Sequence, residues 1–443
     1  MLPIALSNRQ LVCKSGSTNR SRAIVGGPMV ARAGAQAIRP ARRSCVKTRA
    51  MTPIGLSSGS SCSSLSSMTA SFHLSDVSDD EATEIAETRI ICFSAAQYVK
   101  DFLAGPMLKY YPNTAFVEPP LDKDTAQLAE GFDVVVVFVN DFVTAEVAEV
   151  LARGGVKLVA LRCAGFDRVD VEACTRLGIR VVRVPTYSPE SVAEHAVALI
   201  FALNRHLHEA HLRTRMGNYA LSGLVGVELT RKVVGVIGTG AIGVQACRIL
   251  KGIGCQVLAY DVYRNPKVEA MGIPYVSLDE MLPRADILTL HCPLLPSTTH
   301  LINRDTIQRM KRGAMLINVS RGGLIESDAL FDALESGQIG ALGLDVYENE
   351  GGLFFVDFTM YETQTRMRNW DRKFKTLLSY PQVLVTPHSA FLTQEALLNI
   401  ATTTCQNIAD WNLGKALPNE VKPPAPAAPE PEPAPVAAVI AAA

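Results

Sequence analysis

The sequence predicts an α/β fold with two doubly wound parallel-sheet domains, one of them inserted into the other. Short apolar runs alternate with helix-length segments of mixed polarity between residues 88 and 420, as expected of strands that are buried on both faces of a parallel sheet. A glycine-rich turn of the kind that joins a strand to a helix comes only at Gly238, past the middle of the chain. An α/β unit therefore precedes the one that this turn begins.

The first unit is predicted from four short apolar strands. They lie at Ile90–Phe93, Val134–Val139, Leu158–Leu161 and Val181–Val184. A long helix from Pro189 to about Arg215 is expected to join this unit to the next. Its start is clear, because Ser188 suits the N-cap, Pro189 the first helical position and Glu190 the first turn.

The segment KVVGVIGTGAIGVQACRILKGIGCQVLAYD has the order of a dinucleotide-binding fold: strand, glycine turn, helix, strand and acidic residue. Gly238 suits the tight turn, Gly240 lets the backbone approach a pyrophosphate, and Gly243 lets the helix pack closely on the strand. The free N–H groups at the helix N-terminus would bind the phosphate charge. This pattern predicts a Rossmann domain.

Asp261 indicates which dinucleotide binds. It follows the glycines at about the 20-residue interval expected for the acid that binds the ribose hydroxyls of NAD, and its charge would repel the extra phosphate of NADP. Arg264 is near enough in sequence to weaken this preference, or is simply a solvated cation of the loop. We therefore predict NAD as the cofactor.

The rest of the chain completes the predicted domain organisation. Three further strands are expected at Ile287–His291, Ala314–Val319 and Ala341–Asp345. Beyond them, a strand at Val383–Thr386 and a helical run from Leu392 to about Leu413 are too little for a third domain, and we expect them to return to the first unit. The predicted organisation is an NAD-binding domain of residues 187–387, inserted into a discontinuous, flavodoxin-like substrate domain of residues 88–186 and 388–420. The active site is expected in the cleft between the two domains.

Three reactive side chains follow predicted strands, at the sheet edge where ligands bind in such folds. Arg321 comes after INVS and offers a planar fork to a carboxylate, Glu350 ends the motif GLDVYENE, and His388 follows VLVTP. Each of them alone would be an ordinary polar residue. Together they suit the reduction of a carbonyl by hydride, because histidine can protonate the oxygen near neutral pH and a carboxylate would stabilise its imidazolium.

Seven motifs in order carry a resemblance to a known family: LRCAGFDRVD, VPTYSPESVAEHA, VIGTGAIG, LHCPL, NVSRGGLIESDAL, GLDVYENE and TPHSAFLTQEAL. Together, over about residues 88–421, they resemble the D-isomer-specific 2-hydroxyacid dehydrogenases. GGLFFVDF after Glu350 and the insertion before His388 are similar to the lactate branch of that family. The resemblance implies reversible reduction of pyruvate to D-lactate by NADH. It makes His388 the proton donor and acceptor, Glu350 its partner and Arg321 the substrate clamp.

The resemblance also implies further site residues. The substrate residues are the backbone N–H groups of Ala164 and Gly165 on the carboxylate, Tyr187 in the pocket wall, and Phe391 near the methyl group, where plain core packing is an equal alternative. On the cofactor side, the resemblance places Ala241 and Ile242 near the pyrophosphate. It places Cys292, Pro293 and Thr298 near the adenosine, and Val319, Ser320 and Asp345 near the nicotinamide. A homodimer is usual for the family, with a tetramer as the alternative.

Two other functions are compatible with this fold. A relative that acts on hydroxypyruvate, glyoxylate or phosphoglycerate is disfavoured because we find neither an appended regulatory domain nor a Glu-Pro pair after Asp345. The family also contains NAD-sensing transcriptional corepressors, which are binding proteins rather than enzymes. The lack of a basic patch in the body of the chain speaks against that function.

The two ends of the chain differ in composition from its body. Residues 1–75 hold ten Lys or Arg and no acidic residue, which predicts an organelle transit peptide and disordered arm over residues 1–87, with a permanently attached basic arm as the alternative. Plastid and mitochondrial transit peptides share this composition, and the serine cluster from Ser57 to Ser67 favours the chloroplast. Residues 421–443, nearly all Pro, Ala, Glu and Val, predict a disordered tail.

Composition limits the partners of the body. Removing ten of the 43 Lys and Arg leaves 33 against 43 Asp and Glu, a formal charge of −10 that gives no electrostatic reason to bind nucleic acid. No run approaches the roughly 20 uninterrupted apolar residues of a membrane-spanning helix. The ten scattered cysteines form no CxxC pair, which predicts reduced thiols and no zinc site. The expected partner is a small-molecule substrate, without metal, nucleic acid or membrane.

Overall fold

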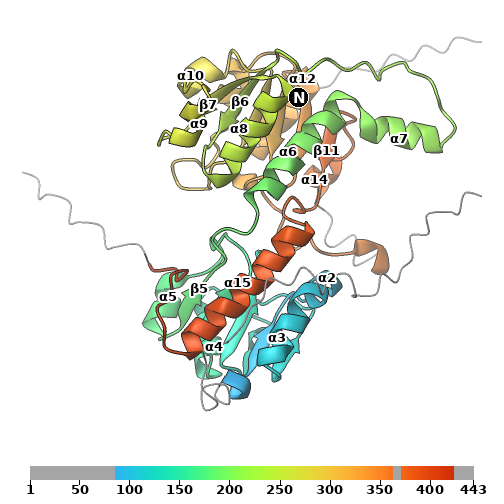
Figure 1. The fold of residues 1–443 in the computed structure, drawn as a ribbon. Helices are drawn as coiled ribbons and strands as arrows, with labels where there is room; N and C mark the ends of the chain where they lie inside the picture. Colours follow the sequence, from blue (N-terminus) through green and yellow to red (C-terminus); the bar gives the residue numbers. More distant parts are fainter. Residues whose placement is uncertain (1–84, 363–370, 424–443) are drawn as a thin grey trace, which may run out of the picture. The chain divides into compact units, whose positions relative to one another are not determined.

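A computed structural model of the protein describes residues 85–362 and 371–423 (Figure 1). These residues contain two parallel sheets, with strand orders β2-β1-β3-β4-β5 and β11-β10-β9-β8-β6-β7. The predicted fold class of two parallel-sheet α/β domains is confirmed. The predicted transit peptide and Pro/Ala-rich tail lie outside the described residues, except at their inner ends, residues 85–87 and 421–423.

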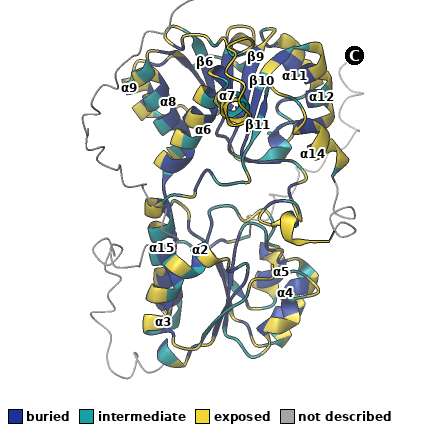
Figure 2. Cartoon of the chain, turned by 90° about the vertical axis from the view of Figure 1, so that its right-hand side faces the viewer, coloured by how far each residue is buried: buried dark blue, intermediate teal, exposed yellow. Residues whose placement is uncertain are grey.

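The first sheet has five parallel strands: β1 (Ile90–Cys92), β2 (Thr114–Phe116), β3 (Val134–Val137), β4 (Leu158–Leu161) and β5 (Arg180–Val182). Val134 and Val136 pack into one hydrophobic cluster, whereas Val135 and Val137 pack into another on the opposite face. Both faces are therefore buried (Figure 2). The helical segments of this part of the chain are α2 (Gln97–Val99), η2 (Lys100–Ala104), α3 (Gly105–Tyr110), η3 (Ala126–Ala129), α4 (Ala145–Arg153) and α5 (Val171–Arg176).

The sequence analysis missed the edge strand β2. Its three residues Thr-Ala-Phe do not form an apolar run, and all three are only partly buried. Because an edge strand is paired on one side only, it needs less apolar surface than the central strands do. The other four strands of this sheet were predicted to within about two residues, the usual uncertainty at element ends.

The second sheet has six parallel strands: β6 (Val233–Ile237), β7 (Gln256–Tyr260), β8 (Ile287–Leu290), β9 (Ala314–Asn318), β10 (Ile339–Leu344) and β11 (Val383–Val385). Strand β6 pairs with both β7 and β8, so the strand order reverses beside the turn that follows β6, which is where such sheets bind ligands. The helical segments in this region are α8 (Ala241–Ile253), α9 (Pro266–Ala270), α10 (Leu278–Met281), α11 (Arg304–Arg309), η4 (Gly322–Leu324), α12 (Ser327–Ser336), η5 (Phe358–Met360) and α14 (Arg372–Leu377).

The long connecting helix is broken into α6 (Pro189–Asn204) and α7 (Leu207–Arg215), which corrects the prediction of one continuous helix. Ser188 caps α6 as predicted, since its side chain accepts a hydrogen bond from the Ser191 N–H at 3.3 Å. The break lies at His206, whose φ of 48° is left-handed. The Asn204 side chain binds the backbone of Val227 there, with hydrogen bonds of 2.8 and 3.2 Å. This contact between distant residues is one that local helix signals cannot reveal.

The expectation that the strand at Val383–Thr386 returns to the first unit is wrong, whereas the predicted NAD-binding range of residues 187–387 includes this strand. Strand β11 pairs with β10 and forms the edge of the second sheet. The following helix, α15 (Gln394–Asn412), instead contacts α3, η2 and β4 of the first sheet. The chain therefore passes from one sheet to the other between β11 and α15, where His388 lies. The proposed domain boundaries at residues 186, 187, 387 and 388 stay a prediction.

Within residues 85–362 and 371–423, no helix is both long and apolar enough to cross a membrane. The same residues contain no group of three or more His, Cys, Asp or Glu side chains placed to hold a metal ion. The seven cysteines in these ranges are buried free thiols.

Candidate active site

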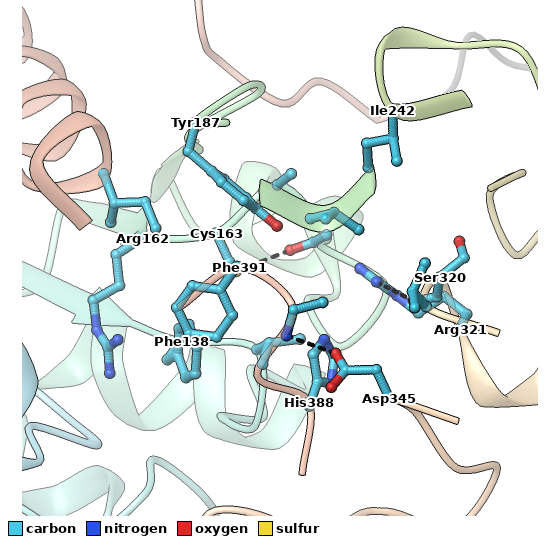
Figure 3. A pocket seen from close by; sticks show the side chains of 17 residues that line it. Phe138, Arg162, Cys163, Tyr187, Ile242, Ser320, Arg321, Asp345, His388 and Phe391 are labelled. Atoms are coloured by element: carbon cyan, nitrogen blue, oxygen red, sulfur yellow. Dashed lines mark hydrogen bonds between the residues drawn. The ribbon is translucent and has the colours of Figure 1, made fainter. Parts of the chain in front are cut away.

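One pocket collects side chains from both sheets (Figure 3). Of the residues predicted from the sequence, it is lined by Ala164, Gly165, Tyr187, Ile242, Val319, Ser320, Arg321, Asp345, His388 and Phe391. Ala164 and Gly165 follow β4, Tyr187 follows β5, and Ile242 lies in α8 after β6. The other residues follow β9, β10 and β11. Ligands are expected at these carboxyl ends of parallel strands.

His388 and Glu350 form a close pair, as the sequence predicted for the catalytic centre. His388 Nδ1 lies 3.1 Å from Glu350 Oε1, and the two side chains are 13% and 9% exposed. A carboxylate only accepts hydrogen bonds, so Nδ1 carries the proton of this contact and Nε2 is left for the pocket. Burial tends to raise the pKa of Glu350, but the hydrogen bond and charge of His388, together with smaller effects of the Tyr347 N–H and Arg168, lower it overall. Glu350 thus stays ionised beside the imidazole.

Asp345 holds the loop that carries His388. Its carboxylate is fully buried and accepts hydrogen bonds from the N–H groups of Ser389 and Ala390, both at 2.9 Å. The Asp345 carbonyl accepts the N–H of His388 itself at 2.8 Å. His388 has a φ of 54°, which is strained for a residue with a side chain. These bonds stabilise that conformation and so fix the direction of the imidazole.

Arg321 reaches the pocket between Asp167 and Gly165. Its Nε lies 3.4 Å from Asp167 Oδ1, and Nη1 donates a 2.9 Å hydrogen bond to the Ser320 carbonyl. A Cβ atom on Gly165 would lie 1.9 Å from Arg321 Nη2. Glycine at this position therefore makes room for the guanidinium, which remains 24% exposed toward the pocket.

Aromatic rings form the wall opposite Arg321, as Figure 3 shows for Tyr187, Phe391 and Phe138. The centre of the Phe391 ring lies 6.3 Å from that of Tyr187 and 5.6 Å from that of Phe138. The Arg162 Cζ atom lies 4.1 Å from the centre of the Phe138 ring. Burial raises the pKa of Tyr187 to about 12, although Arg321 opposes this change. The Tyr187 hydroxyl is therefore protonated at neutral pH and can donate a hydrogen bond.

The glycine turn after β6 has the shape that a dinucleotide needs. Gly238 has a φ of 93°, and a Cβ there would lie 2.5 Å from the Cys292 nitrogen. A Cβ on Gly243 would lie 1.9 Å from the Gly238 carbonyl oxygen, whereas one on Gly240 would meet no atom within 4 Å. The turn and helix α8 thus pack tightly on the sheet and leave open space in front of the helix N-terminus at Ala241. This space fits a pyrophosphate.

The remaining predicted cofactor residues do not line the pocket, and Asp261 and Cys292 contact the turn. Asp261 Oδ2 accepts hydrogen bonds from the Thr239 N–H and hydroxyl, at 2.6 and 3.0 Å. The Cys292 carbonyl accepts the Ser320 hydroxyl at 2.6 Å, and the Pro293 carbonyl accepts that of Thr298 at 2.7 Å. The structure therefore brings the nucleotide side and the substrate side together through the contact of Ser320 with Cys292.

Several residues at the site were missed by the sequence analysis. Asp167 and Arg168 bind Arg321 and Glu350, and Phe138 and Arg162 line the pocket. Arg162, Asp167 and Arg168 lie in the quoted motif LRCAGFDRVD, whose charged residues were a usable signal. The aromatic wall gave none, since Phe138 ends an ordinary apolar strand run.

Comparisons with known proteins agree with this geometry. Residues 197–390 match the NAD-binding domain of the D-isomer specific 2-hydroxyacid dehydrogenases. The chain is 48% identical to a 2-hydroxyacid dehydrogenase homolog of Haemophilus influenzae over 335 residues, covering 76% of this chain and 99% of that protein. It is 44% identical to the D-lactate dehydrogenase of Escherichia coli over 333 residues, covering 75% and 99%.

Solved structures give the same result. A structure described as the pyruvate reductase of Chlamydomonas reinhardtii is similar with a TM-score of 0.73 and 74% identity, over 76% of this chain and 99% of that one. The apo-structure of the Escherichia coli D-lactate dehydrogenase is similar with a TM-score of 0.67 and 42% identity, over 75% and 100%.

Proposed function

Because the chain belongs to the D-isomer-specific 2-hydroxyacid dehydrogenases and carries their NAD-binding domain, we propose that it reversibly reduces pyruvate to D-lactate with NADH. The observation that carries the proposal is the arrangement of one pocket, in which His388, backed by Glu350, lies with Arg321 beside the dinucleotide turn. Relatives named D-lactate dehydrogenase and a neighbour described as a pyruvate reductase support this choice of substrate.

The residues divide the work of the reaction. When bound, NADH supplies a hydride to the keto carbon. Arg321 and the N–H groups of Ala164 and Gly165 hold the substrate carboxylate, which fixes the face of the keto group that is presented. His388 donates a proton from Nε2 to the carbonyl oxygen, and the ionised Glu350 stabilises its imidazolium until then. In the reverse direction neutral His388 takes the proton from the hydroxyl group of D-lactate.

The aromatic wall suits a small apolar substituent on the keto carbon. Phe391 and Tyr187 stand across the pocket from Arg321, so a carboxylate bound to the guanidinium would direct the methyl group of pyruvate toward these rings. Tyr187 also offers a hydroxyl donor. We propose that these contacts favour pyruvate over 2-keto acids with polar side chains.

The test is a steady-state assay of NADH oxidation across a panel of 2-keto acids: pyruvate, hydroxypyruvate, glyoxylate and phosphohydroxypyruvate. We expect pyruvate to give the highest kcat/KM, and chiral analysis of the product to give D-lactate. If one of the other acids gave a higher kcat/KM, that acid and not pyruvate would be the preferred substrate. NADH binding without turnover on any of them would instead favour a binding protein.

We further propose that the protein forms a homodimer, with a homotetramer as the alternative. The support is an exposed arm formed by α7 and the following loop. No residue of α7 is buried, and large apolar side chains along the arm are open to solvent: Leu212 (59%), Met216 (77%), Tyr219 (75%), Leu221 (81%) and Val225 (86%). Light scattering after gel filtration should give at least twice the 47.8 kDa chain mass. A monomeric mass would refute this proposal.

For the location we propose an organelle, with the chloroplast favoured over the mitochondrion. The support is the basic, acid-free composition of residues 1–75 and the serine cluster within them. Mass spectrometry of the protein from its native cells should find the N-terminus between about residues 50 and 87. An intact N-terminus would contradict a cleaved transit peptide.

A further inference from the structure

Arg168 is a second cationic neighbour of Glu350 and does not line the pocket. Its Nη2 lies 3.7 Å from Glu350 Oε1, the same oxygen that faces His388 Nδ1 at 3.1 Å. The other oxygen, Oε2, accepts the N–H of Tyr347 at 3.3 Å. We propose that Arg168 is a positioning residue that sets the pH range in which the His388–Glu350 pair works. This inference rests on the proposed function, because it concerns the same proton transfer.

The guanidinium of Arg168 is held in place by contacts of its own unit. The Arg168 carbonyl accepts the Val143 N–H at 3.0 Å, and the guanidinium lies 4.8 Å over the ring of Phe142. The side chain is 22% exposed. Arg168 follows β4 of the first sheet, whereas Glu350 follows β10 of the second, so the ion pair connects the two halves of the site.

The charge of Arg168 acts on the pair in two ways. It helps to keep the pKa of Glu350 low, against the burial that tends to raise it. Arg168 also competes with the imidazolium of His388 for the negative charge of Glu350, because both cations contact Oε1. Without Arg168, Glu350 would take up a proton at a higher pH.

The other charged groups near His388 are independent of Arg168. Asp345 binds the loop of His388 and lies 3.5 Å from His195 Nε2, and Arg321 is paired with Asp167. Tyr347 contacts Glu350 through its backbone: its N–H donates to Oε2 at 3.3 Å, and its carbonyl accepts the Glu350 N–H at 3.3 Å. Replacement of Arg168 therefore changes one charge beside the pair and leaves these groups in place.

The experiment compares the pH dependence of kcat/KM for wild type, Arg168→Gln and Arg168→Lys, with saturating NADH and the 2-keto acid that the wild type reduces fastest. For reduction, activity falls in acid when Glu350 is protonated. We expect this acid limb of the Arg168→Gln profile to move to higher pH by about 0.5 to 1 unit, and the limb of Arg168→Lys to lie close to that of the wild type.

Arg180→Gln is the matched control. It removes the ion pair of Arg180 Nε with Glu420 Oε1, 2.7 Å long, which belongs to the first sheet and does not line the pocket. Its limbs should stay at the wild-type pH. Thermal unfolding and NADH fluorescence check that each variant is folded, and Arg168→Met serves as a second uncharged variant if Arg168→Gln is not.

The outcomes separate this inference from the proposed function. A lower activity of the uncharged variants with unmoved limbs would overturn the inference, since it is the result of a merely structural contact. An acid limb that moves to lower pH would overturn it as well. A wild type that reduces none of the acids would overturn the proposed function, and the inference with it, before any variant is compared.

Discussion

Replacement of Gly165 by alanine should weaken substrate binding without unfolding the protein. The new Cβ would lie 1.9 Å from Arg321 Nη2 and 3.1 Å from both the Arg321 Cζ and Asp167 Oδ1. Ordinary contact distances are near 3.5 to 4 Å, so the end of the guanidinium must retreat by about 1.5 to 2 Å. A charge-assisted hydrogen bond stretched by that amount is lost, and such bonds contribute about 1.5 to 3 kcal/mol. At about 1.4 kcal/mol per factor of ten, kcat/KM for pyruvate should fall by about 10- to 100-fold.

The atom that must move is the far end of a flexible side chain, and Gly165 has no left-handed φ, so the midpoint of thermal unfolding should hardly change. The assay is steady-state NADH oxidation over a range of pyruvate concentrations, with NADH affinity measured by fluorescence. Gly105→Ala is the control, because a Cβ at Gly105 meets no atom within 4 Å. An unchanged KM for pyruvate in Gly165→Ala would refute the role given to Arg321.

Three further predictions test other parts of the account. Gly243→Ala places a Cβ 1.9 Å from the Gly238 carbonyl oxygen, which is a backbone atom and cannot easily move. The free energy of unfolding in urea should therefore fall by about 1 to 3 kcal/mol, and NADH should bind more weakly. Wild-type values for both would contradict the role given to the glycine turn in cofactor binding. Asp261→Asn removes the charge that repels NADP, so the ratio of kcat/KM with NADH to that with NADPH should fall by about tenfold or more, and a constant ratio would argue against its role. Arg180 lowers the pKa of Glu420, and this stabilisation is present above the ordinary pKa of a glutamate and is lost as the pH falls through the lowered value. Glu420→Gln should therefore cost about 0.5 to 1 kcal/mol at pH 7 and progressively less as the pH falls below the ordinary pKa of a glutamate, whereas a cost that does not change with pH would contradict the ion-pair explanation.

Local signals account for what the sequence predicts well. The dinucleotide turn follows from closely spaced glycines: Gly238 has a positive φ, a Cβ on Gly243 would meet the Gly238 carbonyl, and Gly240 leaves open space. The central strands follow from apolar runs, since both faces of each sheet are buried. His388, Glu350 and Arg321 were placed together because the carboxyl ends of parallel strands share one edge of the sheet.

The errors and omissions concern contacts between residues far apart in the chain. The break before α7 depends on Asn204 binding Val227, and the place of β11 depends on its pairing with β10. The partner of Arg321, Asp167, is 154 positions away, and Arg168 is similarly remote from Glu350. No periodicity or spacing in the sequence reports such ion pairs.

The most direct test of the central claim, that His388 transfers the proton, is the turnover of His388→Gln with pyruvate and NADH. A positioned general acid contributes about 100- to 10,000-fold, so kcat should fall by about 100-fold or more while NADH affinity stays near that of the wild type. A folded His388→Gln variant that turns over within about twofold of the wild type would contradict the account, because a group that gives the proton in the reaction cannot be dispensable.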